Sequence, residues 1–232
     1  MPSLMSDLSL VNPDSLAETL HAVTDAFVDG TPIPPAERER VAVWIAGRQG
    51  QPRSYRGLPA PTNQDYLSAR LYTGEALNSR ASIGHIMGEE AARCLIQLDV
   101  PLPEVQQAIR RNTEIVTRFG LPDDTQCGYY CCGKCSLSFW RHLRVSAIPD
   151  TEARIRKGLG VLSQCREGNG RWRVFPYYYT LFTLLDIDLP EATAELRYAT
   201  SGCERIVKRA LKDDRFAQRR YAIAERVLAR CG

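Results

Sequence analysis

Four cysteines packed into nine residues give this chain its sharpest chemical signal. They are Cys127, Cys131, Cys132 and Cys135. Thiolates bind zinc and other soft metals, and the two-residue gap between Cys132 and Cys135 lets both sulfurs face one tetrahedral zinc at about 2.3 Å. The sequence therefore predicts a metal site, with zinc as the expected ion, formed by these four thiols.

Three other interpretations of the cysteines stay open. Cys132-Gly-Lys-Cys135 also has the spacing of a thioredoxin-type redox dithiol. Cys127, Cys132, Cys135 and Cys165 have gaps of four, two and 29 residues, which are typical of plant-type iron-sulfur proteins. Thiols can also pack a turn and bind nothing. A helix expected from residue 136 places its N-terminal dipole beside the cluster, which favours the thiolate form.

An expected helix over residues 82–98 carries one histidine and two acids of interest. His85 and Glu89 lie one turn apart and could bind a ligand or exchange a proton. Their side of the helix is opposite its apolar stripe, which predicts an exposed pair. Glu90 falls within that stripe, where an unpaired carboxylate is costly. We expect an arginine or a tyrosine hydroxyl as its partner, with a catalytic acid as the alternative.

His142 is the remaining candidate near the cysteines. It lies two turns along the same expected helix from Cys135, about 10 Å away. This distance predicts that the two residues do not share a metal ion.

Apolar residues recur at three- and four-residue steps through most of the chain, which predicts helices. No segment shows strand alternation between hairpin turns, so we expect an all-α fold. About ten helices with short links predict antiparallel pairs in an α/α toroid-like or solenoid-like arrangement. The expected helices span residues 14–28, 34–46, 82–98, 104–119, 136–147, 151–164, 177–187, 191–199, 203–211 and 213–229. The first should be capped by Asn12 or Asp14 and end at Gly30.

The composition excludes several classes of protein. Hydrophobic residues make up 44% and charged residues 25% of the 232 positions, near the globular average. No apolar stretch approaches the length of a membrane span. Residues 1–13 lack the regions of a secretory signal, so we expect a cytoplasmic protein with reduced thiols. We expect one helical domain over residues 1–232, with residues 1–33 as an N-terminal helical arm.

The net charge of +3 is too small to predict nucleic acid as the main partner. Basic residues between positions 205 and 230 alternate with acids at helical spacing, which indicates solvated helix faces. They are a candidate surface for a partner protein, and a hydrophobic small molecule is the alternative partner.

Residues 113–198 resemble the α/α toroid superfamily, which includes terpenoid cyclases and protein prenyltransferase β subunits. Residues 157–172, with Gln164 and the closing Gly-Arg-Trp of 170–172, are similar to the glutamine-tryptophan repeat that ties one helix to the next in terpenoid cyclases. Residues 44–50 are a fainter copy of the same unit. The resemblance implies a ring of helix pairs with apolar inner helices.

Three shorter motifs extend the resemblance toward activity. Cys-Ser-Leu-Ser-Phe-Trp at 135–140 is similar to the prenyltransferase helix start that supplies a zinc-ligating cysteine, which implies Cys135 as a ligand. Phe-Pro-Tyr-Tyr-Tyr-Thr at 175–180 is similar to an inner-helix segment of those enzymes. Asp123 and Asp124 resemble the acidic motif of class II terpene cyclases, which implies proton donors, although an acidic pair there is also an ordinary helix start.

The aromatic residues also allow two interpretations. Trp172, Tyr177, Tyr178 and Tyr179 could line a cavity that stabilises a carbocation or holds an isoprenoid chain. A tyrosine-rich inner helix is more often core.

The functional hypotheses follow from these alternatives. A solvent-open cavity would favour a prenyltransferase- or cyclase-like enzyme with Asp123, Asp124 and Glu90 as acids. A filled core with cysteines at its rim would favour a non-catalytic interaction module with structural zinc, and a redox or iron-sulfur protein is the third hypothesis.

Overall fold

The computed structural model describes residues 9–120, 129–211 and 213–232. Within these ranges the chain forms ten helices and no β-strand, apart from isolated β-bridges between loops. The predicted all-α fold is therefore confirmed. The helices are α1 (Leu16–Asp29), α2 (Pro35–Ala46), α3 (Asp65–Ser68), α4 (Arg80–Leu98), α5 (Pro103–Gly120), α6 (Gly133–Val145), α7 (Thr151–Gln164), α8 (Tyr177–Leu185), α9 (Pro190–Val207) and α10 (Arg215–Cys231). In the described ranges, none of these helices combines the length and hydrophobicity that a bilayer crossing requires.

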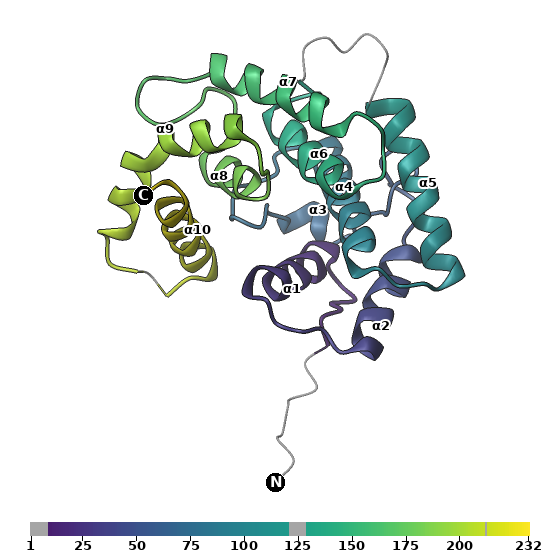
Figure 1. Cartoon of the computed structure of the whole chain (residues 1–232). Coiled ribbons are helices and arrows are strands. Elements are labelled where there is room, and N and C mark those ends of the chain that lie inside the picture. The colour runs from purple at the N-terminus through teal and green to yellow at the C-terminus, as the bar shows by residue number, and fades with distance from the viewer. Residues whose placement is uncertain (1–8, 121–128, 212) are drawn as a thin grey trace.

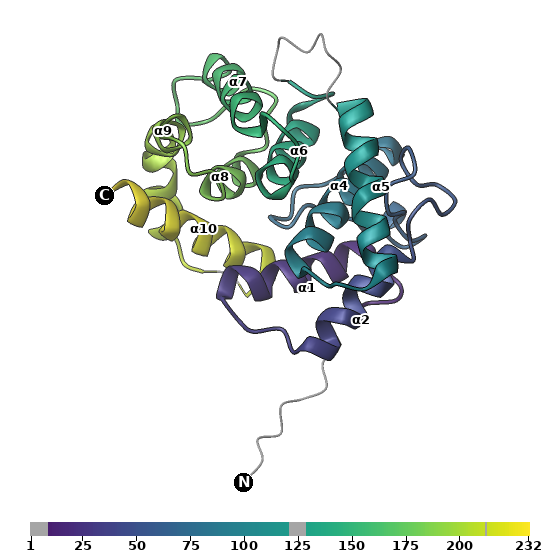
Figure 2. The same cartoon turned by 45° about the vertical axis from the view of Figure 1, so that its right-hand side comes forward.

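The helices are arranged around a common centre (Figure 1). Figure 2 shows α1, α4, α6, α8 and α10 following one another around it, with α2, α5, α7 and α9 farther out. The first and last helices meet, because Arg215 of α10 pairs with Glu18 of α1, and Arg219 pairs with Asp25. Arg215 and Arg219 thus pair with acids of their own chain, and the use of the C-terminal helices by a partner protein stays a prediction. The relationship to the toroid superfamily stays a prediction.

Helix α1 shows how local sequence sets the helix bounds. Ser15 is the N-cap, and its hydroxyl accepts a hydrogen bond from the Glu18 N–H. The predicted caps were wrong by one to three residues, because the Asn12 side chain instead accepts from the N–H of Asp14 in a turn before the helix. Gly30 ends the helix with a left-handed φ of +66°, as predicted.

Helix α9 is continuous where the sequence predicted two helices over 191–199 and 203–211. Gly202 lies inside it, and a Cβ at this position would approach the Tyr177 hydroxyl to 2.2 Å. That hydroxyl donates a hydrogen bond to the carbonyl of Ala199. Gly202 is therefore explained by the close approach of α8, and it does not end a helix.

A buried ionic network lies at the centre of the molecule. Glu90 accepts hydrogen bonds from Arg93 at 2.9 Å, from Arg141 at 3.0 Å and from the Tyr179 hydroxyl at 2.6 Å. Burial opposes ionisation of Glu90, but the two guanidinium charges outweigh it and lower its pKa to about 2. The expectation of an arginine or tyrosine partner is confirmed.

His21 of α1 is a buried base at the junction with α10. Neither ring nitrogen has a hydrogen-bond partner among the described residues, and burial, aided by the charge of Arg219, lowers its pKa from 6.5 to about 4. Glu18 and Asp25 oppose this shift, and Arg215 adds to it. The folded protein therefore keeps His21 neutral at pH values where the unfolded chain binds a proton.

We therefore expect His21 to make the protein acid-sensitive. Stability should fall as the pH drops from about 6.5 toward 4, by about 3 kcal/mol from this residue. Urea denaturation of the wild type and of His21→Leu at pH 7.5 and pH 4.5 would measure it. Other groups titrate in both proteins, so the difference between their losses of stability from pH 7.5 to pH 4.5 is the contribution of His21. An equal loss of stability in both proteins would contradict the prediction.

Candidate metal centre

Two side chains of α4 that the sequence predicted to be exposed are buried. His85 exposes 2% and Glu89 1% of its surface, and His85 Nε2 lies 3.0 Å from Glu89 Oε1. Glu89 also accepts a hydrogen bond from the hydroxyl of Ser138 on α6. The exposure prediction was wrong because α6 packs on the side of α4 opposite the apolar stripe.

The His85 ring is held between two tyrosines. Tyr55 stacks on it with 4.2 Å between ring centroids, and Tyr130 meets it edge-on at 4.8 Å. Because Glu89 engages Nε2, Nδ1 is the nitrogen that can bind a metal. A carboxylate bonded to the second nitrogen is a common way to orient a ligating histidine.

The turn before α6 carries the cysteines. Cys132 is the N-cap, and α6 begins at Gly133, three residues before the predicted start, so Cys135 lies in its first turn. The Ser136 hydroxyl accepts from the N–H of Tyr130 at 2.9 Å and donates to its carbonyl at 3.1 Å. This pair of hydrogen bonds fixes the turn that contains Cys131 and Cys132.

Gly133 lies where another segment of backbone passes closely. A Cβ at this position would come within 2.1 Å of the Val174 carbonyl oxygen and 3.2 Å of the Phe175 Cα. Because backbone atoms cannot rotate away as a side chain can, residue 133 has no room for a larger side chain. This lack of space explains why a glycine lies between Cys132 and Cys135.

We expect Gly133→Ala to lower the free energy of unfolding by about 2 kcal/mol or more, as an overpacked site does. Urea denaturation would measure this change. Gly160→Ala is the matched control, because nothing lies within 4 Å of a Cβ there and the position is helical. Similar stability of the two variants would contradict the prediction.

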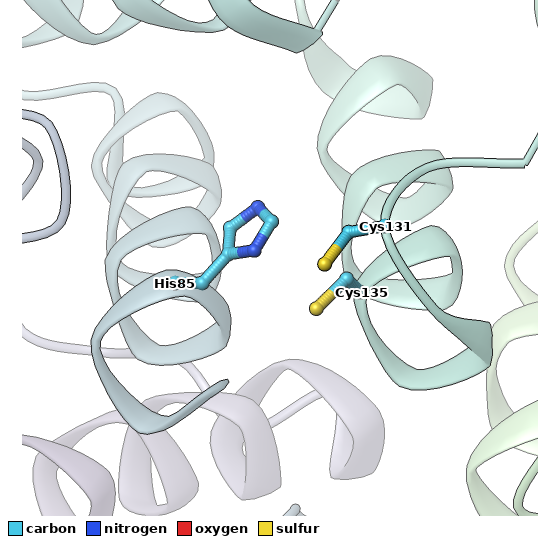
Figure 3. A group of neighbouring side chains, drawn as sticks. All are labelled: His85, Cys131 and Cys135. Carbon is cyan, nitrogen blue, oxygen red and sulfur yellow. The ribbon is translucent and has the colours of Figure 1, made fainter. Parts of the chain in front are cut away.

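Figure 3 shows His85 of α4 facing Cys131 and Cys135. One ring nitrogen and the two sulfurs all lie within 4.8 Å of one another, although Cys131 is exposed and Cys135 is buried. Among the described residues, these three are the side chains whose ligand atoms lie close enough together to hold one metal ion. Two predicted thiols therefore meet a histidine that the sequence did not assign to their site.

Cys132 lies beside this group. Its Sγ is 3.4 Å from the Sγ of Cys135. Two sulfurs bound at 2.3 Å to one tetrahedral zinc are about 3.8 Å apart, so the observed separation is close to that of a shared ion. Cys132 is not a member of the group of three, so its sulfur does not lie within 4.8 Å of every other donor.

Burial raises the pKa of two titratable groups in the site, Cys135 and Glu89. It raises the pKa of Cys135, and the neighbouring Cys132 raises it further. Burial also raises the pKa of Glu89, against the opposing hydrogen bonds from His85 and Ser138. The expected helix-dipole effect on Cys135 is thus outweighed by burial. A coordinated cation would instead lower the pKa of Cys135, because metal-bound thiols lose their proton.

Other predicted site residues are placed elsewhere. Cys127, Asp123 and Asp124 lie outside the described residues. Cys165, the distant member of the iron-sulfur spacing, follows the end of α7 and does not belong to the group of three donors. His142 is fully buried in α6 and does not belong to it either, as its distance from Cys135 along the helix predicted.

The aromatic residues proposed for a ligand cavity are held by specific contacts. The Trp172 indole donates to Glu195 at 2.7 Å, and the Tyr179 hydroxyl donates to Glu90. Trp172, Tyr177 and Tyr179 are buried, whereas Tyr178 is half-buried. Tyr179 lines a cavity of about 20 Å³, which is the size of a water molecule. These contacts match the interpretation of the rings as core, and the isoprenoid cavity stays a prediction.

Comparison with known proteins returned no family match, and neither the curated proteins nor the solved structures gave a significant match to this chain.

Proposed function

We propose that this chain is a zinc-binding helical protein in which the ion joins α4 to the start of α6. The observation that carries the proposal is the convergence of His85 with Cys131 and Cys135 from separate elements. A set of imidazole and thiolate ligands matches the preference of zinc, whereas calcium and magnesium prefer oxygen. The buried carboxylate of Glu89 supports the same assignment, because it orients the histidine.

The proposed role of the zinc is structural. Cys132, whose sulfur contacts that of Cys135 but lies outside the group of three, would turn toward the ion as the fourth ligand. Four protein groups would then close the coordination sphere, whereas catalytic zinc keeps one position for water or substrate. The ion would cross-link segments that are 46 to 50 residues apart, from His85 to Cys131 and Cys135. The burial of Trp172 and Tyr179 and their hydrogen bonds to Glu195 and Glu90 support a non-catalytic module that binds partners at its surface.

Metal analysis of the protein purified without chelators tests this function. We expect one zinc ion per chain in the wild type and loss of zinc in His85→Gln, Cys131→Ser and Cys135→Ser. Cys165→Ser is the matched control, because this thiol lies outside the group of three and should leave the zinc content unchanged. A wild type without zinc, or zinc retained by Cys135→Ser, would overturn the proposal.

A redox dithiol is the second candidate, favoured by the 3.4 Å between the sulfurs of Cys132 and Cys135 at the start of α6. In thiol-disulfide exchange, one thiolate attacks a substrate disulfide, and the second displaces the substrate as a dithiol. The protein would thereby lose two electrons and two protons to the substrate and gain an internal disulfide. This activity requires Cys132 and Cys135 but neither His85 nor Cys131.

The two candidates differ in what each variant should do. Reductase activity toward a small aromatic disulfide that is retained in His85→Gln and Cys131→Ser, in a wild type that purifies without zinc, would favour the dithiol. Zinc that is lost in those same two variants would favour the structural site.

A further inference from the structure

A groove lies on the segment between α2 and the start of α4. It consists of two adjoining cavities of about 840 and 290 Å³, both lined by Arg53. Arg48 lines the larger cavity, and Arg80 lines the smaller one together with the first turn of α4. These volumes are in the range of small-molecule sites.

The arginines of this groove differ from those of the central network. Arg48, Arg53 and Arg80 form no ion pair with any carboxylate in the part of the chain that the structure describes, whereas Arg93 and Arg141 both pair with Glu90. Arg48 donates to a backbone carbonyl, and Arg53 donates to a side-chain amide. Arg53 and Arg80 are therefore not neutralised by an ion pair within the described chain. Burial lowers the pKa of Arg48, and the charge of Asp65 opposes this shift.

Tyr66 gathers two of these guanidinium groups at one place. Arg53 lies 5.9 Å and Arg80 5.7 Å from the centre of its ring, within the range of cation–π contacts. The Tyr66 hydroxyl donates to the carbonyl of Arg53 at 2.9 Å, which fixes the ring relative to the loop. Arg53 itself has a φ of +73°, which is uncommon for a non-glycine residue. The site is thus built around positive charge held by an aromatic ring.

We propose that this groove binds a small phosphate-bearing molecule, with Arg48, Arg53 and Arg80 as the anion contacts. Guanidinium groups match the geometry of phosphate oxygens and stay charged at every physiological pH. The N-terminal end of α4 adds positive potential on the same wall. The low net charge of the chain argues against a nucleic-acid strand as the natural source of the phosphate. Asp14 also lines the larger cavity and should weaken anion binding.

The groove stands next to the metal centre but does not depend on it. Tyr55 lines the smaller cavity and stacks on His85, so one ring separates the two sites. No arginine of the groove is a proposed zinc ligand. Zinc content and phosphate binding can therefore succeed or fail separately.

Isothermal titration of the zinc-replete full chain with pyrophosphate at low and moderate salt tests the proposal. We expect saturable one-site binding that weakens about ten-fold or more in Arg53→Gln and in Arg80→Gln. Asp14→Asn should bind more tightly than the wild type. Arg38→Gln, an exposed arginine of α2 outside both cavities, should bind like the wild type and also reports any heat from metal chelation.

A second measurement on the unmodified chain guards against variants that do not fold. Phenylglyoxal labels accessible arginines, and pyrophosphate should protect Arg53 and Arg80 but not Arg38, as read by peptide mass spectrometry. No binding by the wild type, or equal affinity in Arg53→Gln and Arg38→Gln, would overturn the proposal. Tighter binding of a single-stranded oligonucleotide than of pyrophosphate would contradict the assignment to a small molecule.

Discussion

Removing the proposed zinc ion is expected to lower the free energy of unfolding by about 4 kcal/mol or more, the value for a ligand at a thousand times its dissociation constant. The physical reason is the cross-link between α4 and the turn before α6, which His85, Cys131 and Cys135 would provide. Without the ion, Cys135 is a protonated buried thiol. Guanidinium denaturation of the native protein, the chelator-treated protein and the zinc-reloaded protein would measure the loss and its recovery.

The matched control for chelation is a cysteine variant outside the site. Cys231→Ser changes a half-buried thiol at the end of α10 and should keep the full response to zinc. Cys135→Ser should be less stable than the wild type and no longer respond to zinc. Unchanged stability of the wild type after complete chelation would show that no ion holds these helices together.

Glu90→Gln is expected to have the second large effect, a loss of about 3–5 kcal/mol in the free energy of unfolding. The carboxylate of Glu90 binds Arg93 and Arg141, whose side chains are only 4% and 1% exposed. Replacing the charge leaves two buried guanidinium groups with less compensation, and burial of an unpaired charge is costly. Equilibrium urea unfolding at pH 7 would measure the change.

An exposed ion pair provides the control for this substitution. Glu152→Gln removes the same charge from a pair with Arg156, where the two side chains are 67% and 40% exposed. Surface pairs contribute roughly 0–1 kcal/mol, so this variant should be nearly as stable as the wild type. If Glu90→Gln were no less stable than Glu152→Gln, the central network would be without structural importance.

The helices could be predicted from the sequence because their signals are local. The apolar period marks α4 and α5, and Gly30 marks the end of α1. The errors arose where distant contacts decide. Gly202 continues α9 because Tyr177 of another helix passes beside it, and nothing in the neighbouring sequence shows that approach.

The metal centre could be predicted only in part for the same reason. Cys131 and Cys135 were predicted as ligands because they are close in the sequence. His85 joins them through the packing of α6 on α4, which brings together residues about 50 positions apart. One signal was present: a histidine and a glutamate one helical turn apart form the pair that orients a ligating imidazole. Because the sequence predicted this pair to be exposed, it was not assigned to the metal site.

The aromatic segment around Trp172 and Tyr179 could not be interpreted from the sequence either. The sequence allowed both a cavity lining and a core for Trp172 and Tyr177–Tyr179, with the core as the commoner case, because residue types cannot distinguish the two. Glu195 supplies the hydrogen bond for Trp172, and Glu90 supplies that for Tyr179. Both partners lie on other helices, so the sequence alone could not identify them.

X-ray absorption spectroscopy at the zinc edge of the purified protein tests the central claim most directly. We expect about three sulfur neighbours at roughly 2.3 Å and one nitrogen neighbour at roughly 2.0–2.1 Å, as Cys131, Cys132, Cys135 and His85 would give. The nitrogen signal should disappear in His85→Gln. A shell of oxygen and nitrogen without sulfur, or a nitrogen signal unchanged in His85→Gln, would contradict the proposed metal centre.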